Sequence, residues 1–207
     1  MAMLKPTVWS KKVQWNVGKA KDDKLSRKVW EVTEPFIFSK RNAIDVGTRF
    51  GGVAYYMCRN FDMTYCFDIK RKKTFPNSVI KEKVTHYHGP LGYKFKARNL
   101  KEWRSNPELG GRWHHEFIDE WLENIYNIDD FNFKDIDYYK IDTDGSEDAI
   151  IAGSEKTIKE YKPLIVCEDQ HRDQKAAMDM LFDWGYKIVA TNQTKQKDKV
   201  LLHESRL

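Results

Sequence analysis

Short apolar runs alternate with amphipathic stretches along most of the chain, and glycine, proline or clustered polar residues separate them. Apolar runs bounded by turn residues indicate buried strands, whereas apolar positions that recur every three or four residues indicate helices. These patterns predict strands at 43–46, 63–67, 84–88, 136–141 and 164–167, and helices from Asp22 to Pro35 and at 52–59, 146–161 and 174–184. Strands and helices therefore alternate through the middle of the chain.

The alternation predicts an α/β fold, with a doubly wound, mostly parallel sheet and helices on both of its faces. Gly185 is placed to end the last helix. The apolar segments 186–190 and 199–203 then predict a C-terminal antiparallel hairpin.

The length of 207 residues predicts one domain over 1–207, since domains usually have about 50–250 residues. Residues 1–21 lack clear periodicity and are interpreted as an N-terminal arm. The segment 94–127 is interpreted as an irregular, substrate-side insertion with a short helix at 115–125. Its candidate substrate contacts are aromatic and histidine side chains, namely Trp103, Trp113, His114, His115 and Trp121.

Composition limits the class of protein. Hydrophobic residues make up 41% and charged residues 32% of the chain, a balance that is typical of a globular protein and not of an acidic disordered chain. No window approaches the roughly 18 apolar residues of a membrane span, and the first residues lack a secretory apolar core. We therefore predict a cytoplasmic protein without membrane contact. Cys58, Cys66 and Cys167 lie in apolar segments without metal-binding spacing, which predicts buried, reduced thiols.

The net charge is +5, and a basic run occupies residues 70–73. Such a run could attract an anionic partner. A nucleic-acid-binding protein would normally carry a broader basic face or a known binding module, and the sequence shows neither. A solvated turn is the better interpretation, with nucleic acid as the weaker alternative.

The segment 42–52 is the main indication of function, because an apolar strand passes there into a glycine-bearing loop before a helix. Gly47 and Gly51 allow tight turns and close approach to a ligand, and Asp45 places a carboxylate at the strand end. About 20 residues later, Asp68 ends the next strand at the spacing of an acid that accepts ribose hydroxyls. The pattern predicts a cofactor that contains a nucleoside.

Polar residues also end the other predicted strands. Ligands of doubly wound sheets bind at the carboxyl ends of the strands, so these residues are site candidates. They include His88 and Asp142, with Glu168 after the following strand and His171 nearby.

Several of these segments together resemble the FkbM family of S-adenosylmethionine-dependent methyltransferases. They are 45–51, 127–131, 138–147 and 166–168. The most specific part is Lys-Ile-Asp-Thr-Asp-Gly-Ser-Glu, which ends at Glu147 and precedes an apolar helix. The resemblance covers roughly residues 40–190.

The resemblance implies a Rossmann-like class I methyltransferase that binds S-adenosylmethionine and methylates a hydroxyl of a sugar, glycan or small molecule. The expected cofactor residues are those of the glycine loop and the neighbouring strand ends: Asp45, Gly47, Thr48, Gly51, Asp68 and His88. The chain departs from the family pattern at Thr48 and Arg49, where Ala-Asn is usual, and at Asp68 and Asp144, where Glu is usual. A cation at Arg49 would repel a sulfonium unless it points outward or pairs with the methionine carboxylate.

Methyl transfer to oxygen needs an aligned hydroxyl and a group that removes or weakens its proton. Asp142 is the first candidate, with Glu168 and His171 as its partners. Asp142 either acts as the base or, together with Glu168, holds a divalent metal such as Mg²⁺ that binds the acceptor hydroxyl. Glu147 is equally consistent with a catalytic carboxylate and with one that holds the Gly145 turn.

Three other functions remain open. The positive charge and the aromatic residues would suit a nucleic-acid methyltransferase, but its usual catalytic motifs are absent from the sequence. A nicotinamide dehydrogenase would favour a Gly-x-Gly-x-x-Gly loop, whose spacing residues 47–51 lack. A non-catalytic module that only binds the cofactor is the last alternative, and Arg49 is its one indication.

Overall fold

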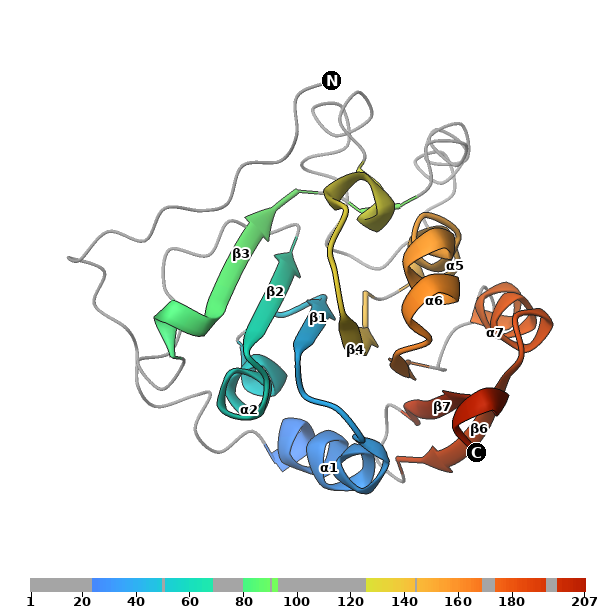
Figure 1. Ribbon diagram of the computed structural model, residues 1–207, viewed down its shortest axis with the longest axis horizontal. Coiled ribbons are helices and arrows are strands. Elements are labelled where there is room, and N and C mark those ends of the chain that lie inside the picture. Colours follow the sequence, from blue (N-terminus) through green and yellow to red (C-terminus); the bar gives the residue numbers. More distant parts are fainter. Residues whose placement is uncertain are drawn as a thin grey trace.

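The computed structural model describes residues 24–49, 51–68, 80–89, 91–92, 126–143, 145–168, 174–192 and 197–207. They form a seven-stranded sheet in the order β3-β2-β1-β4-β5-β7-β6 (Figure 1). The strands are β1 Asn42–Val46, β2 Met63–Asp68, β3 Val84–His88, β4 Ile136–Ile141, β5 Leu164–Cys167, β6 Tyr186–Thr191 and β7 Lys199–His203. The α-helices are α1 Lys24–Thr33, α2 Gly52–Asn60, α5 Glu147–Ala152, α6 Glu155–Tyr161 and α7 Gln174–Asp183.

The strand pairing places a ligand crevice at the centre of the sheet. Strands β1 to β5 are parallel, and β1 pairs with β2 on one side and with β4 on the other. The strand order therefore reverses between β1 and β4, and ligands of open α/β sheets bind at such a switch point. The doubly wound parallel sheet expected from the sequence is confirmed.

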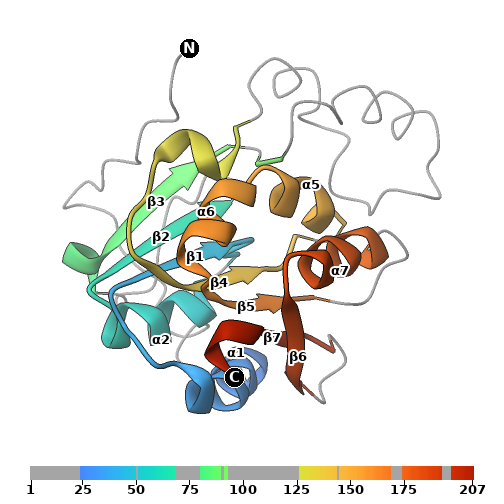
Figure 2. The same cartoon turned by 45° about the vertical axis from the view of Figure 1, so that its right-hand side comes forward.

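Helices cover both faces of the sheet, as Figure 2 shows. On one face, Val29 and Trp30 of α1 and Met57 of α2 share a buried cluster with Tyr138 of β4. On the other face, α5, α6 and α7 share a second buried cluster with alternate residues of the same strands, such as Tyr139. The period of two along the strands thus divides the core into two layers.

The C-terminal hairpin is confirmed, and its order in the sheet follows from burial. Strand β7 lies between β5 and β6 and is antiparallel to both. Its consecutive residues Val200, Leu201 and Leu202 are all buried, whereas Ile188 of β6 is 43% exposed. Apolar residues on both faces suit an interior strand, so β7 takes that place and β6 forms the edge.

The single helix predicted over 146–161 is wrong, because the chain forms two helices there. The break lies at Gly153 and Ser154, where the Ser154 hydroxyl donates to the Ile150 carbonyl at 2.6 Å. The second helix has its own cap from a distant part of the chain: Asp129 accepts the Thr157 amide at 2.9 Å and the Lys156 amide at 2.9 Å. A cap that is supplied from so far along the chain leaves no local signal in the sequence.

The proposed 94–127 insertion lies almost entirely outside the described residues, as do the N-terminal arm and the basic run 70–73. Its two flanks meet, because Leu91 forms a β-bridge with Tyr126 and the Gly92 amide donates to the Tyr126 carbonyl at 3.0 Å. The two described ends that flank residues 93–125 therefore lie side by side. In the described part, no helix is long and apolar enough to span a membrane.

Candidate active site

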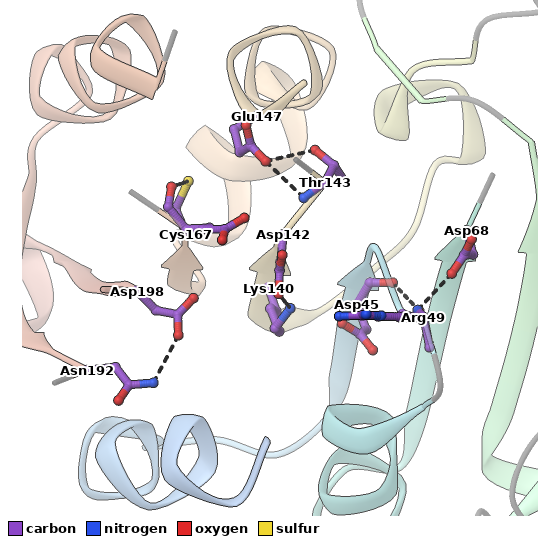
Figure 3. Close-up of polar contacts among 12 residues, drawn as sticks. Asp45, Arg49, Asp68, Lys140, Asp142, Thr143, Glu147, Cys167, Asn192 and Asp198 are labelled. Atoms are coloured by element: carbon purple, nitrogen blue, oxygen red, sulfur yellow. Dashed lines mark hydrogen bonds and ion pairs between the residues drawn. The ribbon is translucent and has the colours of Figure 1, made fainter. Parts of the chain in front are cut away.

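The carboxyl ends of the parallel strands bring together Asp45, Asp68 and Asp142, three of the polar residues that the sequence singled out (Figure 3). Asp68 and His88 are opposite each other in the β2–β3 register. The Asp142 amide donates to the Val46 carbonyl at 3.1 Å, and the Glu168 amide donates to the Ile141 carbonyl at 3.1 Å. The ends of β1, β4 and β5 are thus joined at one edge.

The glycine loop is tied to both neighbouring strands. Gly47 has a φ of 80°, and a Cβ atom built there would lie 1.7 Å from the Asp142 carbonyl oxygen. The Gly47 and Thr48 amides both donate to the Phe67 carbonyl, at 3.0 and 3.1 Å. Gly51 also has a positive φ, of 77°, directly before α2. The glycine at position 47 is therefore required by the close approach of the β4 end, a contact within the protein itself.

Thr48 and Arg49 complete the loop through contacts within the chain. The Thr48 hydroxyl donates to the Asp45 carbonyl at 2.8 Å, and Thr48 is buried. The Arg49 amide donates to Asp68 Oδ2 at 2.7 Å. Because the Gly51 amide also donates within the loop, to the Thr48 carbonyl at 2.8 Å, the four described loop amides are all used internally. The Thr48 side chain therefore helps to hold the loop, and its role as a cofactor ligand stays a prediction.

Asp45 lies beneath the loop as a buried acid. It is 1% exposed, and neither carboxylate oxygen has a hydrogen-bond partner among the described residues. Burial raises the pKa of Asp45 to about 6, although the positive charge of Lys140, its neighbour in the β1–β4 register, works against this rise. Asp45 is therefore buried beneath the loop, and its contact with the cofactor stays a prediction.

The raised pKa of Asp45 predicts a pH dependence of stability. The unfolded pKa is 3.8 and the folded one about 6, so the folded state binds the proton more tightly, and the free energy of unfolding falls as pH rises from about 4 to 6. Asp45→Asn should remove this loss. The stability of the variant relative to the wild type should increase by about 2 kcal/mol between pH 4.5 and 7.5, measured by urea unfolding at both values. A relative stability that is the same at both pH values would contradict the assignment.

Lys140 begins the motif that carries the family resemblance but was not predicted as a site residue, and the structure pairs it with Asp142. It is buried within β4, and its Nζ lies 2.8 Å from Asp142 Oδ2. Burial alone would lower the pKa of Lys140, but Asp142, Asp45 and Asp198 outweigh burial and raise it, so the ammonium stays charged. A lysine in a strand predicted to be buried was the available signal, since lysine is rarely fully buried without a partner.

The Lys140 ammonium lowers the pKa of Asp142. Burial tends to raise the pKa of Asp142, but the charge and hydrogen bond of Lys140 override it, and Glu168 and Arg49 lower it further. The Asp142 side chain is 20% exposed, whereas that of Lys140 is 4% exposed. Asp142 is therefore an ionised, partly exposed carboxylate at the edge of the sheet, and Lys140 Nζ holds its Oδ2.

The open question about Glu147 is answered by its contacts. Its Oε1 accepts the Thr143 amide at 2.8 Å and the Thr143 hydroxyl at 3.0 Å, and Oε2 accepts the Gly145 amide at 3.1 Å. Glu147 is 1% exposed. It holds the turn after β4 and so fixes the backbone that carries Asp142.

Other predicted site residues are placed as follows. Glu168 is 2% exposed beside Asp142, and the three cysteines are buried and free as expected. His171, His114 and His115 lie outside the described residues. Asp198, missed in the sequence, is 1% exposed and accepts the Asn192 side-chain amide at 3.0 Å. Over the described ranges, no group of three or more His, Cys, Asp or Glu is arranged to hold a metal ion.

The model of the methyltransferase FkbM domain matches residues 70–188, which is more than half of the chain. No curated protein matches it. A protein from Lactococcus lactis described as a "putative hemolysin" has a similar structure, with a TM-score of 0.51 and 13% identity over 86% of this chain and 84% of that one. At this identity the likeness shows a shared fold alone.

Two methyltransferase structures are similar with lower TM-scores. A precorrin-6y C5,15-methyltransferase from Geobacter metallireducens GS-15 has a TM-score of 0.47 and 12% identity, over 94% of this chain and 92% of that one. A methyltransferase FkbM from Methylobacillus flagellatus KT has a TM-score of 0.46 and 14% identity, over 78% of this chain. The match spans 43% of that FkbM protein, so this chain corresponds to less than half of its length.

Proposed function

The chain belongs to the methyltransferase FkbM domain family, and from this premise we propose that it is an S-adenosylmethionine-dependent O-methyltransferase. The acceptor we propose is a hydroxyl of a sugar, a glycan or another small molecule. Asp142 is proposed to contact that hydroxyl and Asp68 the ribose of the cofactor.

The observation that carries the proposal is the convergence of carboxylates at the carboxyl ends of β1, β2, β4 and β5. Asp45, Asp68, Asp142 and Glu168 all lie there, and each is buried or partly buried. Their field attracts the sulfonium and the ammonium of S-adenosylmethionine and repels the pyrophosphate of a dinucleotide. The loop amides also favour S-adenosylmethionine over a dinucleotide. A pyrophosphate would need amide donors, and the amides of Gly47, Thr48, Arg49 and Gly51 already donate within the protein.

Bound S-adenosylmethionine supplies a methyl group that is already activated by a positive sulfur. Asp68 suits the ribose because the Arg49 amide fixes its Oδ2 and so holds the carboxylate at the end of β2. Asp142 lies two strands away, on the far side of β1, where the reacting end of a ligand that spans the switch point would be.

Asp142 can serve an acceptor hydroxyl as a positioned hydrogen-bond acceptor and base. Lys140 Nζ lies 2.8 Å from Asp142 Oδ2, and this ion pair fixes the carboxylate at the strand end. A carboxylate fixed in this way aligns the hydroxyl and draws on its proton as the new bond forms. The alternative, a divalent metal held by Asp142 and Glu168, would have to bind beside this ammonium, which disfavours it.

Calorimetric titration with S-adenosylmethionine, S-adenosylhomocysteine and NAD tests the cofactor assignment. We expect both adenosyl ligands to bind and NAD not to bind. Asp68→Asn should weaken adenosyl binding by about 10-fold to 100-fold, because hydrogen bonds to a charged group contribute about 1.5–3 kcal/mol. The amide oxygen of the variant can still accept from Arg49, so the loop is kept.

The matched control is Asp62→Asn, an exposed acid before β2 at the opposite end of that strand. It should leave all three titrations unchanged. Tight binding of NAD, or adenosyl binding that Asp68→Asn does not weaken, would refute the cofactor assignment.

A further inference from the structure

Arg49 is held in an unusual conformation at the proposed cofactor site. Its φ is 48°, in the left-handed region that residues with a side chain seldom adopt. Asp68 Oδ2 fixes its amide at 2.7 Å, and Thr48 on its other side is buried. The backbone therefore gives Arg49 a defined starting direction.

The side chain of Arg49 crosses the end of β1 toward β4, as Figure 3 shows. In this view its guanidinium lies on the side of Asp45 and Asp142, away from Asp68. Its positive charge reaches Asp142 and contributes to lowering the pKa of that carboxyl. Arg49 thus places a cation between the residue proposed for the ribose and the residue proposed for the acceptor.

This position has a consequence for the ligand of the proposed function. If the ribose lies at Asp68 and the methyl group lies toward Asp142, the amino-acid part of S-adenosylmethionine passes the loop that carries Arg49. That part contains the one anionic group of the ligand, its α-carboxylate. The surrounding Asp45, Asp68, Asp142 and Glu168 would repel this carboxylate, so it needs a cation nearby. The Lys140 side chain is only 4% exposed, whereas Arg49 is exposed and its guanidinium lies along the path.

We propose that Arg49 binds the α-carboxylate of S-adenosylmethionine through its guanidinium. The inference rests on the proposed function, since it concerns the same cofactor site. A guanidinium offers paired N–H donors that match a carboxylate, and such charge-assisted pairs are among the stronger hydrogen bonds in proteins. Arg49 then draws the amino-acid part of the ligand to the loop and keeps its own charge directed at the carboxylate and away from the sulfonium.

A matched pair of ligands isolates the carboxylate. S-Adenosylmethionine and its decarboxylated form both carry the sulfonium and the ammonium, and they differ only in the α-carboxylate. Each is titrated calorimetrically against the wild type, Arg49→Asn, Arg49→Lys and Arg59→Asn. Asparagine is chosen because it tolerates the left-handed conformation at position 49. Arg59, an exposed arginine near the end of α2, is the control.

In Arg49→Asn, the affinity for S-adenosylmethionine should fall by about 10-fold to 100-fold, while the affinity for the decarboxylated ligand stays within about threefold. Arg49→Lys should lie between the wild type and Arg49→Asn, because it keeps the charge and loses the paired donors. Arg59→Asn should behave as the wild type with both ligands.

An equal change for the two ligands, or tighter binding of S-adenosylmethionine by Arg49→Asn, would overturn the role of Arg49. These results differ from a failure of the proposed function, in which the wild type itself would bind neither ligand. Thermal unfolding of each variant without ligand checks that the substitution leaves the fold intact.

Discussion

Asp142→Asn should lower the rate of methyl transfer by about 10²-fold to 10⁴-fold, the range that a positioned acid or base contributes. The substitution keeps an oxygen that can accept from Lys140 Nζ, which lies 2.8 Å from Asp142 Oδ2 in the wild type. It removes the negative charge that would draw the proton from an acceptor hydroxyl. The affinity for S-adenosylmethionine should change by less than about threefold, because Asp142 is proposed to serve the acceptor and not the cofactor.

The measurement is the transfer of a labelled methyl group to a panel of hydroxylated sugars and small molecules, followed by rate measurements on an acceptor that the wild type methylates. Asp62→Asn provides the same chemical change at an exposed site away from the carboxyl ends of the strands and should transfer at the wild-type rate. Adding a chelator separates the two roles of Asp142, since transfer continues if it is a base and stops if it holds a metal. An Asp142→Asn variant as fast as the wild type would exclude both roles.

Gly47→Ala should destabilise the protein by about 2–5 kcal/mol and abolish binding of the adenosyl ligands. The added Cβ would lie 1.7 Å from the Asp142 carbonyl oxygen, so the ends of β1 and β4 must separate. Forcing a side chain into a filled site costs about 1–3 kcal/mol, and the φ of 80° adds about 1–2 kcal/mol for a residue with a Cβ atom. This is a large part of the roughly 5–15 kcal/mol by which domains are stable.

Gly145→Ala is the control, because Gly145 also has a positive φ, of 114°, but a Cβ atom there would have no neighbour within 4 Å. It reports the cost of backbone strain without the clash. Urea unfolding should therefore show a larger loss for Gly47→Ala than for Gly145→Ala. Equal losses of unfolding free energy in the two variants would mean that the end of β4 moves away from the added Cβ atom at little cost. The close contact at Gly47 would then not be needed for stability.

The fold was predictable because its signals are local. Apolar runs such as Ile136–Ile141 and Leu164–Cys167 are strands in the structure, with bounds close to those expected. A local signal fails where the stabilising partner is distant. The break between α5 and α6 depends on Asp129 accepting the Thr157 amide at 2.9 Å, a contact across 28 positions that no window of sequence contains.

The site was predictable in part for the same reason. A residue at the end of a parallel strand lies at one common edge wherever it is in the chain, so Asp45, Asp68, Asp142 and Glu168 could be expected to converge. The partner of a buried charge cannot be obtained in this way. Lys140 of β4 lies opposite Asp45 of the neighbouring strand β1. Asp198, which comes from the C-terminal hairpin, also raises the pKa of Lys140.

The amino-acid sequence alone therefore determined the class of fold, because periodicity is a property of short segments. Its motifs also carried the resemblance to a methyltransferase family that the domain model confirms. Tertiary structure alone decided the roles. Thr48 and Glu147 turned inward to hold the loop and the turn after β4, and Lys140 became the counter-charge of Asp142. Such roles depend on which groups share a buried volume, and burial raises the energetic cost of any charge or hydrogen-bonding group that lacks a partner.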